Sequence, residues 1–149
     1  MPQPAGNTAG GVPQVDWTKA FDAQSQAAFG QAFAPDVALE ATLLTRPIEG
    51  RERVARVMAV MSNTYESLEF THQATNGRRT YLEWTALALG GLQLKGVTVL
   101  LRDEQDRIAT VAIHHRFLNE SLLLSEHAGQ QLLDVLGPDD FYNPAVRTR

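Results

Sequence analysis

Apolar residues recur along the chain with two spacings, one typical of helices and one typical of strands. Over about residues 17–33 they return at three- and four-residue steps behind Asp16, a suitable N-cap, which predicts a helix interrupted near Gly30. After Gly50 the spacing is i, i+3, i+4, i+7 and i+11, which predicts a second, amphipathic helix. Its inward positions are Val54, Val57, Met58, Met61 and Tyr65.

Alternation of apolar and polar residues predicts five strands, over residues 37–45, 68–75, 80–89, 92–102 and 108–117. The pairs Asn76-Gly77 and Gly90-Gly91 are typical of hairpin turns, because both central residues of the favoured turns need a positive φ. Residues 103–106 supply a third turn. The last four strands should therefore form an antiparallel meander. Asn119 caps a final helix that stops at Gly137-Pro138.

This order of elements predicts one α+β domain, a cone-shaped curved antiparallel sheet packed on N-terminal helices around a pocket. A chain of 149 residues is long enough for one core and too short for two ordinary domains. We expect the domain to cover residues 16–137. Residues 1–15 are poor in bulky apolar side chains and predict a flexible N-terminal tail, and residues 138–149 predict a C-terminal tail.

Composition narrows the possible partners. With 13 Lys+Arg against 17 Asp+Glu and no basic cluster larger than pairs such as Arg78-Arg79, a nucleic-acid partner is not expected. The chain has no cysteine, which excludes disulfides and thiolate chemistry and fits a cytoplasmic protein. Apolar runs such as Val97–Leu101 are far shorter than the about 18–20 residues of a membrane span, and the N-terminus lacks a signal-peptide pattern. No membrane partner and no cofactor are expected.

The last strand carries the main candidate for chemistry. Alternation places Val111, Ile113, His115 and Phe117 on one face, and its apolar members indicate that this face points inward. Because its unperturbed pKa is about 6.5, His115 could act as an acid or base in the pocket. The alternative is a buried histidine that bonds to a backbone group or only lines the pocket. His114 points the opposite way, so the pair cannot share a metal ion and no metal site is expected.

Further residues are expected to line the same pocket. Trp84 beside His115 could stack against a flat hydrophobic ligand, whereas the methionines are equally typical of an ordinary core. Tyr65 and His72 are weaker candidates, and Glu40 and Glu83 belong to outward-facing positions of their strands. The complete predicted set is Trp17, Met58, Met61, Trp84, Thr98, Ile113 and His115.

Five segments, in order, resemble the nuclear-transport-factor-2-like superfamily, in particular its SnoaL-like proteins. The resemblance covers about residues 16–125 and implies the cone fold. The superfamily includes ketosteroid isomerases, polyketide cyclases, limonene epoxide hydrolases, scytalone dehydratases and non-catalytic binding modules, so the fold leaves the function open. The segments are residues 33–41 (FAPDVALEA), 47–52 (PIEGRE), 82–86 (LEWTA), 96–99 (GVTV) and 106–108 (DRI).

The catalytic patterns that this resemblance implies are mostly missing. The base, tyrosine and protonated aspartate of ketosteroid isomerases correspond to about Ala41, Trp17 and Thr98, none of which can move the proton as required. The Arg, Asp and Asp of limonene epoxide hydrolases correspond to about Trp84, Ala86 and His115. SnoaL-like cyclases use a carboxylate near the last of these positions, which an imidazole could replace.

Three functions remain open. The first is a small cone-fold protein that binds a small hydrophobic molecule in an apolar pocket. The second is an isomerase, cyclase or dehydratase that uses His115, with Thr98 or Tyr65, as acid or base on a polycyclic or carbonyl substrate. The third is an interaction module. In each case we expect a homodimer through the convex face of the sheet, where Val97, Val99 and Leu101 would otherwise be exposed.

Overall fold

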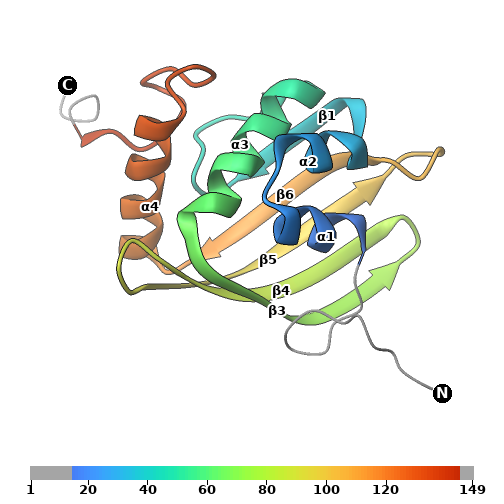
Figure 1. The fold of residues 1–149 in the computed structure, drawn as a ribbon, viewed down its shortest axis with the longest axis horizontal. Helices are drawn as coiled ribbons and strands as arrows, with labels where there is room; N and C mark the ends of the chain where they lie inside the picture. The colour runs from blue at the N-terminus through green and yellow to red at the C-terminus, as the bar shows by residue number, and fades with distance from the viewer. Residues whose placement is uncertain (1–14, 145–149) are drawn as a thin grey trace.

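The computed structural model describes residues 15–144, and the tail predicted for residues 1–15 lies almost entirely outside them. Four helices and six strands follow one another along this part of the chain (Figure 1). They are α1 (Asp16–Ala23), α2 (Gln26–Ala32), β1 (Phe33–Ala41), β2 (Ile48–Glu49), α3 (Arg51–Thr64), β3 (Tyr65–Asn76), β4 (Arg79–Ala88), β5 (Leu92–Arg102), β6 (Ile108–Arg116) and α4 (Leu118–Gln131).

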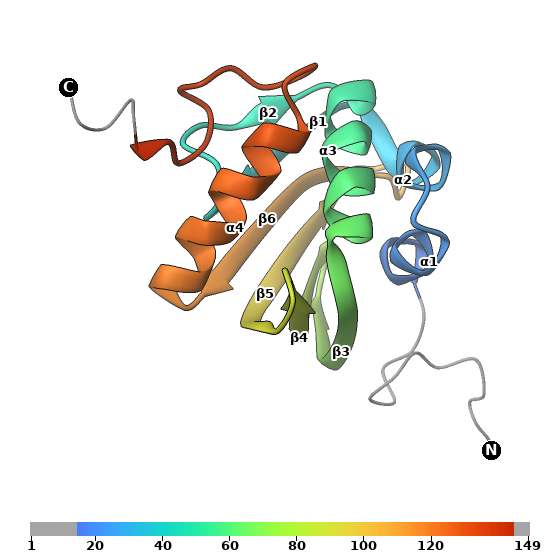
Figure 2. The same ribbon diagram turned by 60° about the vertical axis from the view of Figure 1, so that its left-hand side comes forward.

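All six strands belong to one curved sheet, in the order β2-β1-β6-β5-β4-β3. The meander from β3 to β6 is antiparallel, as predicted. The sheet is not antiparallel throughout, because β1 pairs in parallel with β6 and places Leu39 opposite Val111. Helices α1, α2 and α3 lie on one face of the sheet, and α4 lies beside α3 at the end where β6 stops (Figures 1 and 2). The α+β cone predicted from the sequence is confirmed, with one parallel pair, β1 and β6, next to the edge strand β2.

The first helical segment breaks earlier than the sequence indicated. Gln24 adopts a left-handed conformation with φ 54° and ends α1, and the Ser25 side chain then accepts a hydrogen bond from the Ala28 N–H and caps α2. The predicted break near Gly30 is therefore wrong, since a serine N-cap is the stronger local signal. The strand that follows covers Phe33–Ala41 rather than 37–45.

Aromatic rings join the N-terminal helices to the sheet. Trp17 is fully buried, with its ring centroid 5.5 Å from that of Phe29 on α2, and the Phe21 ring centroid lies 5.7 Å from that of Phe70 on β3. An ion pair of 2.6 Å between Arg102 and Asp16 fastens the start of α1 to β5. These contacts hold α1 and α2 against the concave face of the sheet. Within residues 15–144 no helix is both long and apolar enough to cross a membrane.

The C-terminal tail predicted from residue 138 onward is wrong for residues 138–144, which pack on the domain. Asp140 is buried and forms an ion pair with Arg46, and its carbonyl accepts a hydrogen bond of 2.9 Å from the Thr45 N–H. Phe141 bridges to Leu44 and lies over Gly129 of α4, where a Cβ atom would come 2.0 Å from the ring. The absence of a side chain at Gly129 therefore leaves the space that the Phe141 ring occupies. Residues 145–149 lie outside the described part of the chain.

Phe117 does not belong to the inner face of the last strand. Strand alternation predicts Phe117 on the inner face with His115, but β6 ends at Arg116 and Phe117 is the N-cap residue of α4. Its side chain is 53% exposed. The predicted cap, Asn119, lies within the first turn of the helix instead.

Candidate functional site

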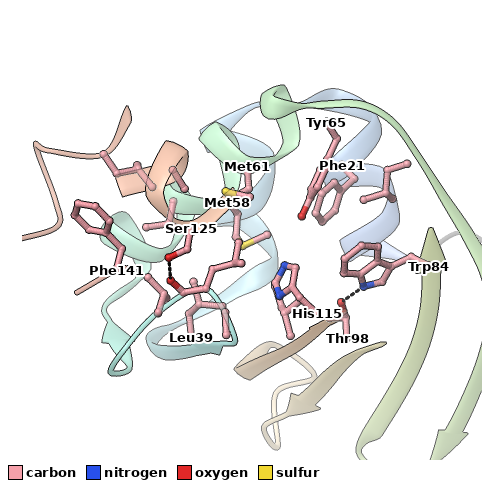
Figure 3. A pocket seen from close by; sticks show the side chains of 18 of the residues that line it. Phe21, Leu39, Met58, Met61, Tyr65, Trp84, Thr98, His115, Ser125 and Phe141 are labelled. Carbon is pink, nitrogen blue, oxygen red and sulfur yellow. Dashed lines mark hydrogen bonds between the residues drawn. The ribbon is translucent and has the colours of Figure 1, made fainter. Parts of the chain in front are cut away.

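An apolar cavity lies between the concave face of the sheet, α3 and α4 (Figure 3). Its open volume is about 30 Å³, which is room for roughly two water molecules. No charged side chain lines it among the described residues. Its wall includes Phe21, Leu39, Ala41, Leu43, Leu44, Val57, Met58, Met61, Tyr65, Phe70, Trp84, Thr98, Ile113, His115, Ser125, Ala128, Leu132, Leu136 and Phe141.

His115 projects from β6 into this cavity, as strand alternation predicted (Figure 3). Its backbone N–H donates a hydrogen bond of 2.9 Å to Thr42 Oγ1, which anchors the end of the strand. The ring nitrogen Nδ1 is buried and has no hydrogen-bond partner among residues 15–144. Burial lowers the pKa of His115 to about 4; the Ile113 carbonyl opposes this shift and His114 adds to it. The imidazole is therefore uncharged at neutral pH.

Trp84 and Thr98 form the wall beside this imidazole. The Trp84 Nε1–H donates a hydrogen bond of 3.0 Å to Thr98 Oγ1. The indole meets the His115 ring edge to face, with centroids 5.4 Å apart. A Cβ atom on Gly96 would come 2.3 Å from the indole, so the missing side chain at that position lets the ring lie against β5. Trp84 thus has a fixed place and its only polar atom is already bonded.

Tyr65 closes the cavity from the opposite side. It follows α3 directly and begins β3, and its hydroxyl points into the cavity (Figure 3). Its ring centroid is 6.1 Å from that of Trp84. Burial alone raises the pKa of Tyr65, so the phenol keeps its proton and is a hydrogen-bond donor. The sequence alone made Tyr65 a weaker candidate for the pocket, because it lies at the junction of a helix and a strand, where alternation does not define the direction of a side chain.

The structure brings six of the seven predicted residues together around the cavity: Met58, Met61, Trp84, Thr98, Ile113 and His115. Their role in binding stays a prediction. Trp17 does not line the cavity, which corrects the expectation. It packs among the aromatic rings of α1 and α2, and Phe21, one turn further along α1, reaches the cavity instead.

The other candidates lie away from the cavity. His72 and Glu83 are exposed on the sheet, where His72 Nδ1 lies 3.3 Å from Glu83 Oε1. Glu40 is exposed, as its place on β1 predicted. Within residues 15–144, no three histidine, aspartate or glutamate side chains come close enough together to hold a metal ion.

Sequence reasoning missed the part of the wall made by α4 and the C-terminal segment. The Ser125 hydroxyl donates a hydrogen bond of 2.6 Å to the Leu43 carbonyl and accepts one of 2.9 Å from the Tyr142 N–H. Phe141 closes the same end. The spacing of leucines in α4 predicted a buried face, but no signal in the sequence showed that residues after Gly137-Pro138 return to the core.

Comparison with known proteins places the chain among small α+β folds. Residues 15–111 match the family model described as a SnoaL-like domain. A steroid delta-isomerase from Pseudomonas aeruginosa has a similar structure, with a TM-score of 0.73, 20% identity, and coverage of 80% of this chain and 88% of that one.

Two further solved structures are similar. An uncharacterised protein with a cystatin-like fold from Silicibacter pomeroyi has a TM-score of 0.73 and 16% identity over 77% of this chain and 81% of its own. A putative isomerase of the SnoaL-like family from Agrobacterium tumefaciens has a TM-score of 0.54 and 16% identity over 68% and 95%. At such identities the likeness extends to the fold alone. No curated protein matches the sequence.

Proposed function

We propose, from the premise that the chain belongs to the SnoaL-like domain family, that it binds a small hydrophobic molecule in the cavity between the sheet, α3 and α4. The observation that carries the proposal is the wall of this cavity. It consists mainly of aliphatic, methionine and aromatic side chains and has no charged member among the described residues. Concave apolar sites with a few placed polar groups are the usual form of small-molecule sites.

The volume supports a small ligand. The open space of about 30 Å³ accommodates only a few heavy atoms as it stands. Even a single aromatic ring therefore needs some wall side chains to move, and a polycyclic molecule would need more of them to do so. Met58 and Met61 are the flexible part of the wall, since methionine has three rotatable side-chain bonds and adapts to the shape of its neighbours.

Acid–base catalysis is the second candidate, and one observation favours it: His115 and Tyr65 are two titratable groups that face the same cavity. The pKa of His115, lowered to about 4, argues against it. A general acid or base works best when its pKa lies near the operating pH. At neutral pH this imidazole is uncharged, so it is a poor general acid, and its low pKa makes it a weak base. Ligand binding is therefore the function that the site supports better.

Toluene is a suitable probe, because it is small, uncharged and purely apolar. We expect toluene to shift the amide NMR signals of cavity residues in the wild-type protein. Ala128→Leu and Ala41→Val extend wall side chains into the cavity and should weaken this binding at least tenfold. Ala27→Leu makes a similar exchange on the exposed face of α2 and should leave binding unchanged. The proposal is wrong if wild type shows no toluene-dependent shifts, or if both cavity variants, folded by circular dichroism, bind as wild type does.

We also propose that the convex face of the sheet binds a second copy of the chain, so that the protein is a homodimer, as the sequence predicts. Val97 and Val99 are half-buried there, and on neighbouring β4 the outward side chains of Tyr81 and Leu87 are 37% and 36% exposed. Light scattering should give the mass of a dimer at micromolar concentration and that of a monomer for Val99→Lys. A monomeric wild type would contradict this. The cytoplasmic location inferred from the cysteine-free composition stays a prediction.

A further inference from the structure

We propose that the ligand of this cavity carries one uncharged hydroxyl group, which lies between His115 and Tyr65. This inference rests on the proposed function, because it takes the cavity as the binding site. It goes beyond that function by naming the chemical class of the ligand and the end of the cavity that its polar group occupies.

Of the polar side chains in the cavity wall, His115 and Tyr65 have the most capacity left to bind a ligand, while the Thr98 hydroxyl can still donate its own hydrogen. Thr98 Oγ1 accepts the hydrogen bond of Trp84, and Ser125 Oγ both donates and accepts within the protein. The imidazole of His115 has a buried nitrogen without a partner among residues 15–144. Burial raises the pKa of Tyr65, so its hydroxyl keeps its proton and can donate it to a ligand. Buried polar groups in proteins are normally hydrogen-bonded, so the His115 nitrogen lacks what a ligand could supply.

These two groups converge on one end of the cavity. The His115 ring rises from β6, and the Tyr65 hydroxyl projects toward it from the opposite wall (Figure 3). The other end is closed by Leu132, Leu136 and Phe141, which offer no side-chain polar atom. A ligand that fills the cavity therefore has its polar group beside His115 and its apolar body toward Phe141.

The polar group of the ligand must be uncharged. Neither of these two side chains is charged at neutral pH, since burial lowers the pKa of His115 to about 4 and raises that of Tyr65. No lysine, arginine, aspartate or glutamate from any element lines the cavity among the described residues. An ionised ligand group would be buried without a counter-charge, which is strongly unfavourable.

A hydroxyl group fits the donors and acceptors better than a carbonyl. The Tyr65 phenol donates one hydrogen bond, and a neutral imidazole has one donor and one acceptor nitrogen. A hydroxyl accepts from Tyr65 and can donate to His115 or accept from it, so it satisfies either tautomer. A carbonyl only accepts and leaves the imidazole acceptor unpaired in one of the two tautomers. Small phenols and alcohols are therefore the expected ligands.

Phenol and toluene form the matched probe pair for the test, because they differ only in the polar group. The quantity measured is the ratio of the toluene Kd to the phenol Kd, compared between variants, since this comparison cancels the different hydration of the two probes. His115→Phe and Tyr65→Phe should each lower this ratio at least tenfold. The control exchanges His114→Phe and Tyr81→Phe on the outer face should leave it unchanged.

A second readout follows the imidazole itself. Phenol should move the ¹⁵N chemical shifts of the His115 ring in wild type, and toluene should not. Unchanged affinity ratios in both cavity variants overturn the inference while toluene binding, and with it the proposed function, stands. Absence of binding by either probe overturns both. If benzaldehyde, which accepts but cannot donate, shows the same dependence on His115 as phenol, the hydroxyl assignment is wrong.

Discussion

The two ends of the cavity are built in different ways. The polar end, with Tyr65, Trp84, Thr98 and His115, lies on strands β3 to β6, which are neighbours in the sheet. The apolar end, with Leu44, Leu132, Leu136 and Phe141, joins segments that are distant in the sequence through an isolated bridge and side-chain contacts. Ladder pairing fixes the polar end, whereas tight packing fixes the apolar end. The two ends should therefore respond differently to substitution.

Removing the Phe141 ring should have the largest effect. Phe141→Ala leaves an unfilled space over Gly129 and opens the apolar end, which should lower the free energy of unfolding by about 3–5 kcal/mol. Urea denaturation measures this. Phe117→Ala removes a ring that is 53% exposed and should cost less than about 1 kcal/mol. Equal effects of the two substitutions would show that residues 138–144 do not close the cavity.

Acid should act mainly on the polar end. The folded-state pKa of His115 is about 4, below its ordinary 6.5, so between these values the unfolded chain binds a proton that the folded protein excludes. His115 should therefore destabilise the fold as the pH falls from 6.5 to 4, by up to about 3 kcal/mol, with no further contribution below pH 4. The difference between the stability–pH curves of wild type and His115→Phe isolates this term. Tyr81→Phe, on the outer face, should retain the wild-type slope; a flat difference for His115→Phe contradicts the prediction.

A side chain at position 96 should disturb the polar end without opening the cavity. In Gly96→Ala the new Cβ would lie 2.3 Å from the Trp84 indole and 2.6 Å from the His114 carbonyl oxygen, so the indole must shift. Overpacking of this kind costs about 1–3 kcal/mol. The NMR signal of the Trp84 indole N–H should move as its hydrogen bond to Thr98 changes. The adjacent exposed exchange Lys95→Ala should leave both quantities nearly unchanged, and an unmoved indole signal in Gly96→Ala would contradict the prediction.

Neutralising Asp140 should weaken the apolar end by the smallest amount. Its hydrogen bond with Arg46 lowers the pKa of Asp140, with burial opposing and the Gly137 N–H adding to the shift. A carboxyl with a depressed pKa stabilises the fold above its unfolded-state pKa of about 3.9, and this stabilisation is lost as the pH falls through the folded value. Asp140→Asn should cost on the order of 1–2 kcal/mol at pH 7, measured by urea denaturation. Asp139→Asn, at an exposed neighbour, is the control; matching losses would exclude a specific role for Asp140.

The same contrast explains what the sequence could and could not reveal. Hairpin turns fix the register of neighbouring strands, so alternation alone placed Thr98 and His115 on the concave face. The helical spacing around Trp17 correctly predicted burial but not which part of the core the ring enters, because that depends on the break at Gln24–Ser25. Phe141 follows the Gly137-Pro138 pair, which is typical of the end of a helix. Its return depends on contacts with Leu44 and Gly129, which no local pattern encodes.

The parallel pairing of β1 with β6 has a consequence for the order in which the molecule folds. Leu39 meets Val111 only after the intervening chain has been brought back, and the entropy of closing such a loop is lost before the contact stabilises anything. The hairpins of the meander close over short loops and should form first. The cavity is then complete only in the last step, so a ligand that needs it should slow unfolding and leave the refolding rate unchanged. Stopped-flow refolding with and without toluene measures this, and faster refolding with toluene would show that the cavity exists before the rate-limiting step.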